Sequence, residues 1–330
     1  MDKLTRRQWL KHVSWLVPGI GLSLWLPTRI KAQSPTPTVE KVSKPLPPLA
    51  VYQFQSVRVD RSGKIIQELP LSAQYFTEEL GSGISIDMVL IPGGVFTMGT
   101  PEGQRGDYTG SDQPPHLVVV PPFFMGKYAV TQPQWQAVAN LPKVNLDLNP
   151  DPSYFKATNR PVETVSWFDA REFCARLSRL TGRDYELPGE SRWEYACRAG
   201  TTTPYSFGET ITSALANYYA ERDPFADEAP GEYRQQTTPV GSFPPNDFGL
   251  YDVHGNVYEW CADGWHDNYQ GAPANGEVWP AKADSRGDRF RILRGGGWGT
   301  ETRQCRSATR SKFSPHNRYS VIGLRLAMSI

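Results

Sequence analysis

The stretch GLYDVHGNVYEW, residues 249–260, combines turn residues, apolar residues and oxygen donors. Gly249, Gly255 and Asn256 tolerate the positive φ angles of tight turns. Asp252 and Glu259 carry carboxylates, and calcium binds such hard oxygens together with main-chain carbonyls. The stretch therefore predicts one of two structures. It is either a calcium-binding loop or a strand–turn–strand corner in which Asp252 and Glu259 make ordinary hydrogen bonds at the surface. The residue types alone favour the corner.

The bulk composition indicates a soluble, loop-rich globular chain. Hydrophobic residues make up 39% of the 330 positions and charged residues 21%, which excludes a disordered polypeptide. The net charge of +1 gives no electrostatic basis for binding nucleic acid. Gly and Pro number 29 each, so loops are expected to outweigh long helices.

The N-terminus predicts export. Residues 5–11, TRRQWLK, form a twin-arginine pattern, and a broken apolar stretch follows at 13–27. We expect a signal peptide over residues 1–32, a periplasmic or extracytoplasmic location, and no stable membrane span after cleavage. An uncleaved N-terminal anchor is the alternative. The Pro-rich segment 33–50 is expected to be an extended linker.

The rest of the chain predicts an α+β fold. Residues 51–82 suggest a short β-hairpin extension, and the main domain is expected over 83–330. In that domain Thr131 with Gln134 forms a capping-box pattern for a short helix. Two better helices are predicted, one from Ser166 to a stop at Gly182 and one over 189–199. Short, irregular, mostly antiparallel strands should surround them.

Six stretches together resemble the formylglycine-generating enzyme, or sulfatase-modifying factor, family. They are IPGGVFTMG (91–99), PVETVSW (161–167), ELPGESRWEYA (186–196), GLYDVHGNVYEW (249–260), LRGGGW (293–298) and IGLR (322–325). They occur in the family's order and span about residues 83–330. The resemblance implies a loop-rich variant of the C-type-lectin fold.

The resemblance also implies two structural calcium sites. The first would use Asp252, the main-chain oxygens of Gly255 and Val257, and Glu259. The second would use Asn217, the carbonyl of Tyr218 and an acid further on, for which Glu232 aligns best. Calcium would cross-link loops that have few contacts of their own.

The catalytic pattern of the family is incomplete. Its formylglycine-forming members carry two cysteines four residues apart, which as thiolates hold Cu(I) and activate oxygen. Here only Cys305 is present, next to Arg306, and Gly297 replaces a serine. Copper is therefore not expected. Cys305 remains the single candidate catalytic residue, and the sequence leaves open whether the chain is an enzyme. If it is one, the resemblance implies an oxidoreductase that does not form formylglycine.

Cys174 and Cys197 match positions that form disulfides in the exported family enzyme. The usual partner of Cys197 is Ser307 here, and Cys305 lies two residues away, so a Cys197–Cys305 bridge is possible. The usual partner of Cys174 is Leu326. Buried free thiols are the alternative.

Two classes of function fit the resemblance. Family members without the cysteine pair are linked to the oxidative maturation of peptide-derived metabolites. The same fold also carries the ligand-binding surface of variable proteins encoded by diversity-generating retroelements. This second resemblance implies that the chain binds a peptide or protein ligand. The expected ligand-binding residues are Trp298, Thr300, Glu301, Arg303, Arg306 and Arg310. The arginines could equally pair with internal acids such as Glu259.

Overall fold

The structure is a computed structural model that describes residues 45–330, except 105, 107–108, 222–224 and 282–289. The expected twin-arginine signal and most of the expected Pro-rich linker lie outside the described residues. Within the described part, no helix has the length and apolar character needed to cross a membrane.

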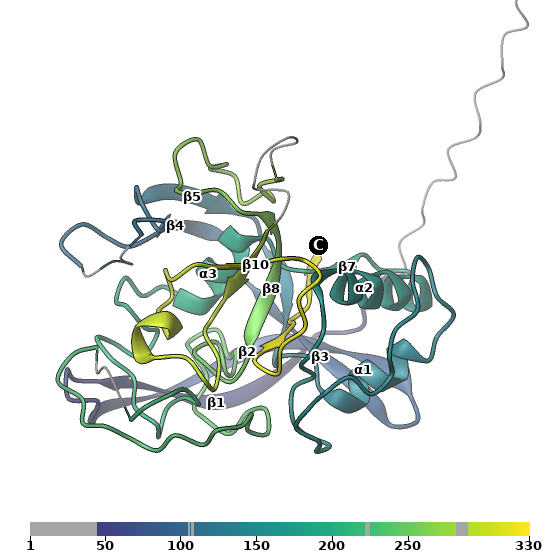
Figure 1. Cartoon of the computed structure of the whole chain (residues 1–330), viewed down its shortest axis with the longest axis horizontal. Coiled ribbons are helices and arrows are strands. Elements are labelled where there is room, and N and C mark those ends of the chain that lie inside the picture. The colour runs from purple at the N-terminus through teal and green to yellow at the C-terminus, as the bar shows by residue number, and fades with distance from the viewer. Residues whose placement is uncertain (1–44, 105, 107–108, 222–224, 282–289) are drawn as a thin grey trace, which may run out of the picture. The chain divides into compact units, whose positions relative to one another are not determined.

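A six-stranded sheet forms the base of the domain (Figure 1). Its order is β1 (Ala50–Val59), β2 (Ile65–Gly81), β3 (Ile84–Ile91), β6 (Phe123–Gly126), β12 (Ala327–Ser329) and β7 (Tyr185–Glu186). Every neighbouring pair is antiparallel. The C-terminal strand β12 fills the gap between β6 and β7, so the end of the chain holds the sheet together.

The β-hairpin expected at residues 51–82 is part of this sheet and not a short extension. The C-terminal part of β2, from Tyr75 to Gly81, pairs with β3, which makes β1 and β2 the first two strands of the domain. Val57, Val59 and Phe76 are buried in its core. The sequence prediction missed this because Pro70 and the exposed alternate positions of β2 obscured a long strand.

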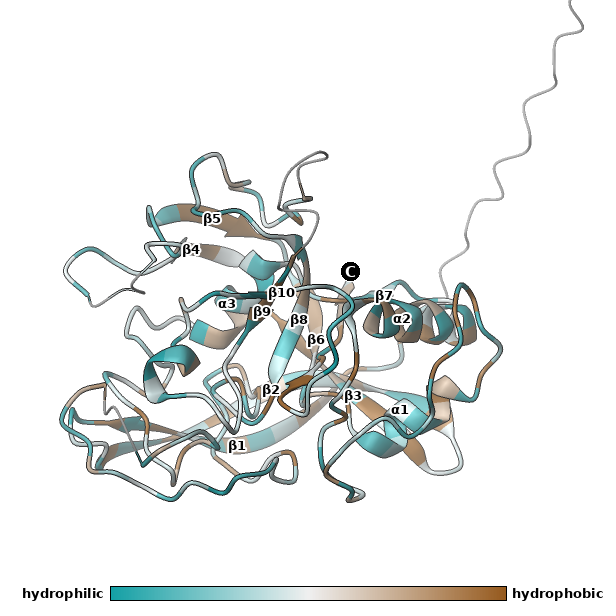
Figure 2. Ribbon diagram, viewed as in Figure 1, coloured by the Kyte–Doolittle hydropathy of each residue, from teal (hydrophilic) through white to brown (hydrophobic). Residues whose placement is uncertain are grey.

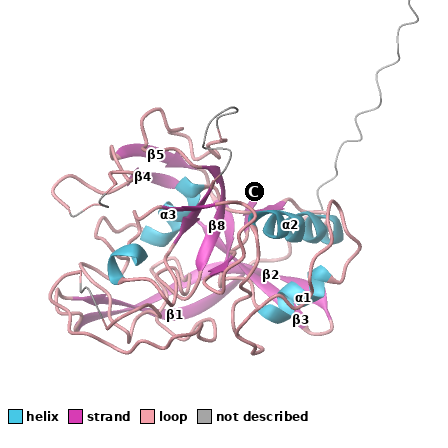
Figure 3. Ribbon diagram, viewed as in Figure 1, coloured by secondary structure: helices cyan, strands magenta, loops and turns pink. Residues whose placement is uncertain are grey.

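The remaining described strands form two smaller sheets (Figures 1 and 3). Strands β8 (Tyr258–Gly264), β9 (Arg291–Arg294), β10 (Ser311–Phe313) and β11 (Ile322–Gly323) pair in the order β10-β9-β8-β11, with β11 parallel to β8. Strands β4 (Gly94–Met98) and β5 (His116–Val120) form an antiparallel pair. Loops make up much of the remaining chain, as Figure 3 shows.

The helices begin and end at the expected signals. Helix α1 (Gln132–Ala139) follows a capping box of Thr131 and Gln134. Helix α2 (Trp167–Thr181) starts after the capping box of Ser166 and ends at Gly182, whose left-handed conformation suits glycine. Helix α3 (Glu190–Arg198) is the third α-helix, and a 3₁₀-helix spans Thr302–Cys305.

Large aromatic side chains anchor the core. Trp135, Trp193 and Trp260 are almost completely buried. Full burial of a large apolar side chain contributes about 1.5–3 kcal/mol. Figure 2 shows hydrophobic residues along β3 and β5, and alternate residues of β5 nevertheless face solvent: Leu117 is 66% exposed whereas Val118 is buried.

Candidate functional site

The stretch 249–260 forms the expected turn and leads into strand β8. Asp252, Gly255 and Asn256 all have positive φ angles. A Cβ atom at Gly255 would lie 2.4 Å from the carbonyl oxygen of Asn217, so only glycine fits there. The Asn256 amide donates to that same oxygen at 2.7 Å. The turn therefore brings the two expected calcium segments side by side.

Asp252 presents an open oxygen toward the interior. Its Oδ2 accepts a hydrogen bond from the Gly241 amide at 2.7 Å, whereas its buried Oδ1 has no hydrogen-bond partner. Burial raises the pKa of Asp252 to about 6. An uncompensated buried carboxylate oxygen is costly, and a bound cation would compensate it. Asp252 thus fits the role of a calcium ligand.

Glu259 is already occupied. Arg325 donates to both of its oxygens at 2.7–3.0 Å, and the Trp193 indole nitrogen donates to Oε2 at 2.6 Å. All three side chains are buried. The carboxylate that the resemblance assigns to calcium is therefore neutralised by an internal arginine, beside the main-chain segment of Gly255 and Val257.

The second expected site fits only in part. The Oδ1 of Asn217 is buried without a partner, like that of Asp252. Tyr218 is buried next to it in the chain. Glu232 does not fit, because its side chain is 66% exposed and pairs with Arg234 at 3.0 Å. Among the described residues, no group of three or more His, Cys, Asp or Glu side chains could hold a metal ion.

Cys305 does not have the surroundings of a catalytic thiol. It ends the 3₁₀-helix and is completely buried. Its sulfur lies 3.6 Å from the Thr300 hydroxyl and 3.8 Å from the Glu301 carbonyl oxygen. Burial raises its pKa to about 12, so the thiol stays protonated at neutral pH. Both nucleophilic attack and Cu(I) ligation need the thiolate.

Cys197 faces Ser307 and not Cys305. The Cys197 sulfur lies 3.6 Å from the Ser307 hydroxyl and 3.9 Å from the His254 ring. All four cysteines are free and buried, so the possible Cys197–Cys305 bridge is not formed in this structure. Burial lowers the pKa of His254 to about 4, and the neutral ring accepts from the Ser206 amide while hydrogen bonding to the Cys305 carbonyl oxygen.

Two of the expected ligand-binding arginines are internal. Arg306 is buried against Asp112 at 3.3 Å and the Thr100 hydroxyl at 3.0 Å. Arg310 is buried and pairs with both oxygens of Glu190. The prediction that they contact a ligand is wrong, because the buried acids take up their donors and buried charges are stable only when so paired.

The remaining expected residues lie near the surface beside an aromatic row. Glu301 and Arg303 pair with each other at 2.8 Å, and Thr300 holds the backbone of the turn at Gly297. Trp298 is half-buried and donates its indole N–H to the Ser320 carbonyl oxygen at 2.9 Å. Its ring therefore has a fixed orientation, and further rings flank it on both sides.

We define the aromatic row as Tyr154, Phe155, Trp298, Tyr233 and Tyr219. Successive ring centroids are separated by 4.9, 5.4, 6.3 and 4.3 Å in that order. Tyr154 is 74% exposed, and the other four rings are half-buried. Only Trp298 was predicted from the sequence. The others lie on loops 65 or more residues away, where no periodicity marks them.

The chain resembles known proteins over most of its length. It is 30% identical over 288 residues to the chaperone protein LppX of Paenibacillus barcinonensis, covering 74% of this chain and 90% of that protein. It is 30% identical over 301 residues to the inactive C-alpha-formylglycine-generating enzyme 2 of Bos taurus, covering 76% and 90%. A match to the serine/threonine-protein kinase pkn1 of Chlamydia pneumoniae, at 31% identity, covers 75% of this chain but only 38% of that protein.

Solved structures similar to this chain also match it over most of its length. PvdO from Pseudomonas aeruginosa has a TM-score of 0.65 at 33% identity, covering 77% of this chain and 98% of that one. The Treponema denticola variable protein 1 has a TM-score of 0.61 at 26% identity, covering 78% and 99%, and shares the C-type-lectin-like fold. The sulfatase-modifying factor enzyme 1-like domain matches residues 81–330, and the chain belongs to that family.

Proposed function

We propose that this chain is a non-catalytic binding module that captures a peptide or protein ligand on the aromatic row. The observation that carries this proposal is the convergence of five rings from three separate loops around Trp298, at least one of them largely exposed. Tyrosine and tryptophan supply rigid contact area at low entropic cost, and they are enriched among residues that dominate binding energy.

The neighbouring side chains suit such a ligand. Glu301 and Arg303 form a partly exposed ion pair near the row, and Glu232 with Arg234 forms another. Charges of both signs around an aromatic centre resemble the polar rim of a protein interface. The names of two relatives, a chaperone and an inactive enzyme, are compatible with a binding role.

The binding proposal is tested with a displayed library of random linear peptides. We expect the wild-type protein to enrich peptides that contain aromatic or apolar residues, and Trp298→Ala to enrich none of them. The matched control is Leu180→Ala, which removes an exposed apolar side chain on helix α2. Equal enrichment by the wild-type protein and Trp298→Ala would place ligand binding elsewhere.

Oxygen-dependent oxidation of a thiol peptide is the second candidate function, and family membership is what favours it. The burial of Cys305 argues against it, because a completely buried thiol with a raised pKa is closed to a substrate and is a poor nucleophile. We expect no oxygen consumption with a cysteine-containing peptide, with or without added Cu(I). Oxygen uptake that disappears in Cys305→Ser would restore the enzymatic interpretation.

We also propose a structural calcium ion held by Asp252 with the main-chain oxygens of Gly255 and Val257. The buried, unpartnered Oδ1 of Asp252 supports this site. When bound, the ion would neutralise the buried Asp252 carboxylate and fix the turn.

Export by the twin-arginine route remains our proposal for location, and fusion of residues 1–32 to a reporter protein would test it.

A further inference from the structure

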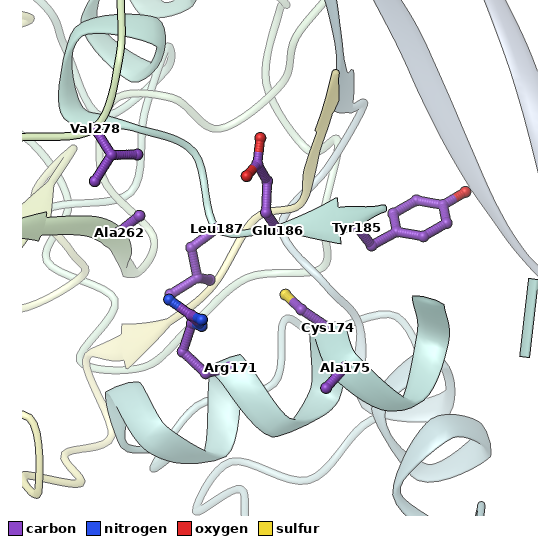
Figure 4. Close-up of a pocket in the computed structure, with 8 residues that line it drawn as sticks. All are labelled: Arg171, Cys174, Ala175, Tyr185, Glu186, Leu187, Ala262 and Val278. Carbon is purple, nitrogen blue, oxygen red and sulfur yellow. The ribbon is translucent and has the colours of Figure 1, made fainter. Parts of the chain in front are cut away.

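A hollow of about 370 Å³ opens on the domain at helix α2 and strand β7 (Figure 4). Figure 4 shows Arg171 and Cys174 on α2 and Glu186 and Leu187 at the end of β7, with the Glu186 carboxylate directed away from α2 and with Ala262 and Val278 on a third side. None of these residues belongs to the aromatic row. The hollow lies within the lower part of the volume range of small-molecule pockets.

One unpaired cation and one carboxylate that is paired through a single oxygen lie at this hollow. Arg171 makes no hydrogen bond or ion pair with the residues that the structure describes, and its guanidinium stacks on the Trp167 ring at 5.1 Å. Glu186 receives both of its contacts at Oε1, from Arg192 at 3.1 Å and Ser329 at 3.4 Å. Its Oε2 has no partner among the described residues. A fixed cation and an open anionic oxygen thus line one pocket.

The remaining walls are apolar or neutral. Ala262 and Val278 offer hydrocarbon surface, Val278 being 38% exposed, whereas Leu187 behind them is completely buried. The Cys174 thiol is protonated, because burial raises its pKa to about 12. The lining therefore matches a ligand that carries a carboxylate, an ammonium group and an apolar side chain.

We propose that this hollow binds a small zwitterion, namely an apolar amino acid or a dipeptide. Arg171 would hold the ligand carboxylate, where a guanidinium donates paired hydrogen bonds. Glu186 Oε2 would accept from the ammonium group. Ala262 and Val278 would contact the apolar side chain. This inference is independent of the proposed function, because it uses none of the residues of the aromatic row.

The test is isothermal titration calorimetry of the full mature chain with the dipeptide Leu-Leu and, separately, with leucine. Arg171→Gln and Glu186→Gln should each weaken binding at least about tenfold, because each loses a charge-assisted hydrogen bond. Arg179→Gln, which changes an exposed arginine on the same helix outside the hollow, should bind as the wild type does.

Two further measurements keep the outcome decisive. Ala262→Leu should fill the hollow and abolish binding while the circular dichroism spectrum stays that of the wild type. N-acetyl-leucine amide, which lacks both charges, should not bind. The proposal is overturned if neither leucine nor Leu-Leu binds, if N-acetyl-leucine amide binds as tightly as Leu-Leu, or if Arg171→Gln retains wild-type affinity.

Discussion

At the residue scale, buried ion pairs decide which sequence-predicted side chains are available to a ligand. Glu259, Glu190 and Asp112 each hold a buried arginine. Only Glu259 was named from the sequence as a possible partner of the arginines, because the pairing scheme depends on contacts between residues far apart in the chain. Motif matching located the residues and could not show which of their charges are already satisfied.

The Glu259–Arg325 pair gives a direct test of that distinction. We expect Arg325→Met to lower the free energy of unfolding by about 3–5 kcal/mol, because it leaves Glu259 charged and buried without its partner. Urea denaturation followed by fluorescence measures the change. A matched control is Lys143→Met, which breaks an exposed ion pair with Asp147 and should change stability by less than about 1 kcal/mol. Similar effects of the two substitutions would refute the structural role of Glu259.

Asp252 should make the calcium-free protein pH-sensitive. Its pKa is raised by burial from 3.8 to about 6, so the folded state binds more protons than the unfolded state over that range. Stability is therefore lost as the pH rises from about 4 to 6, by up to about 3 kcal/mol. Asp252→Asn removes this term, and calcium should suppress it in the wild type.

The measurement compares unfolding free energies of wild type and Asp252→Asn between pH 3.5 and about 7 in a calcium chelator. The variant is needed because neutral His254, with its pKa lowered to about 4, contributes stability that increases with pH over an overlapping range. We expect the stability of Asp252→Asn relative to the wild type to increase up to about pH 6 and then level off. A difference independent of pH would show that Asp252 does not titrate as described.

At the element scale, the hairpin of β1 and β2 is an integral part of the fold. Phe76 of β2 is buried in the main core and contacts Phe124 of β6 with ring centroids 4.9 Å apart. The family model begins at residue 81, after this hairpin, and so does not include these strands. The sequence prediction had the same limit, because the recognisable motifs begin at Ile91.

Phe76→Ala should therefore destabilise the whole domain. Removal of a buried phenylalanine side chain costs about 3–5 kcal/mol through lost contacts and the cavity left behind. Ile66→Ala on the same strand is the control, since that side chain is 64% exposed and should cost less than about 0.5 kcal/mol. Thermal unfolding measures the difference. A melting temperature of Phe76→Ala equal to that of the wild type would contradict the place of the hairpin in the core.

At the scale of the whole molecule, helix caps and turn residues were predictable and the aromatic row was not. Thr131, Ser166 and Gly182 mark helix ends by local hydrogen bonding and backbone conformation, which the sequence encodes within a few residues. The aromatic row brings together loop residues that are far apart in the chain. Its rings share no spacing, so long-range folding had to be known first.

The same contrast applies to the candidate chemistry. The sequence placed Cys305 in the family's catalytic segment, and only the three-dimensional structure shows that its sulfur is completely buried beneath the Gly296–Thr300 turn. Family membership therefore predicts the fold well. It does not predict whether a thiol is exposed, and that property separates oxidation from binding.

The most direct test of the binding account is calorimetric titration of one library-selected peptide into wild type, Trp298→Ala and Cys305→Ser. We predict that Trp298→Ala weakens binding at least about thirtyfold, the loss of about 2 kcal/mol expected for a binding hot spot. Cys305→Ser should bind within about twofold of the wild type, because its sulfur does not reach the surface. Wild-type affinity in Trp298→Ala together with lost binding in Cys305→Ser would contradict the account.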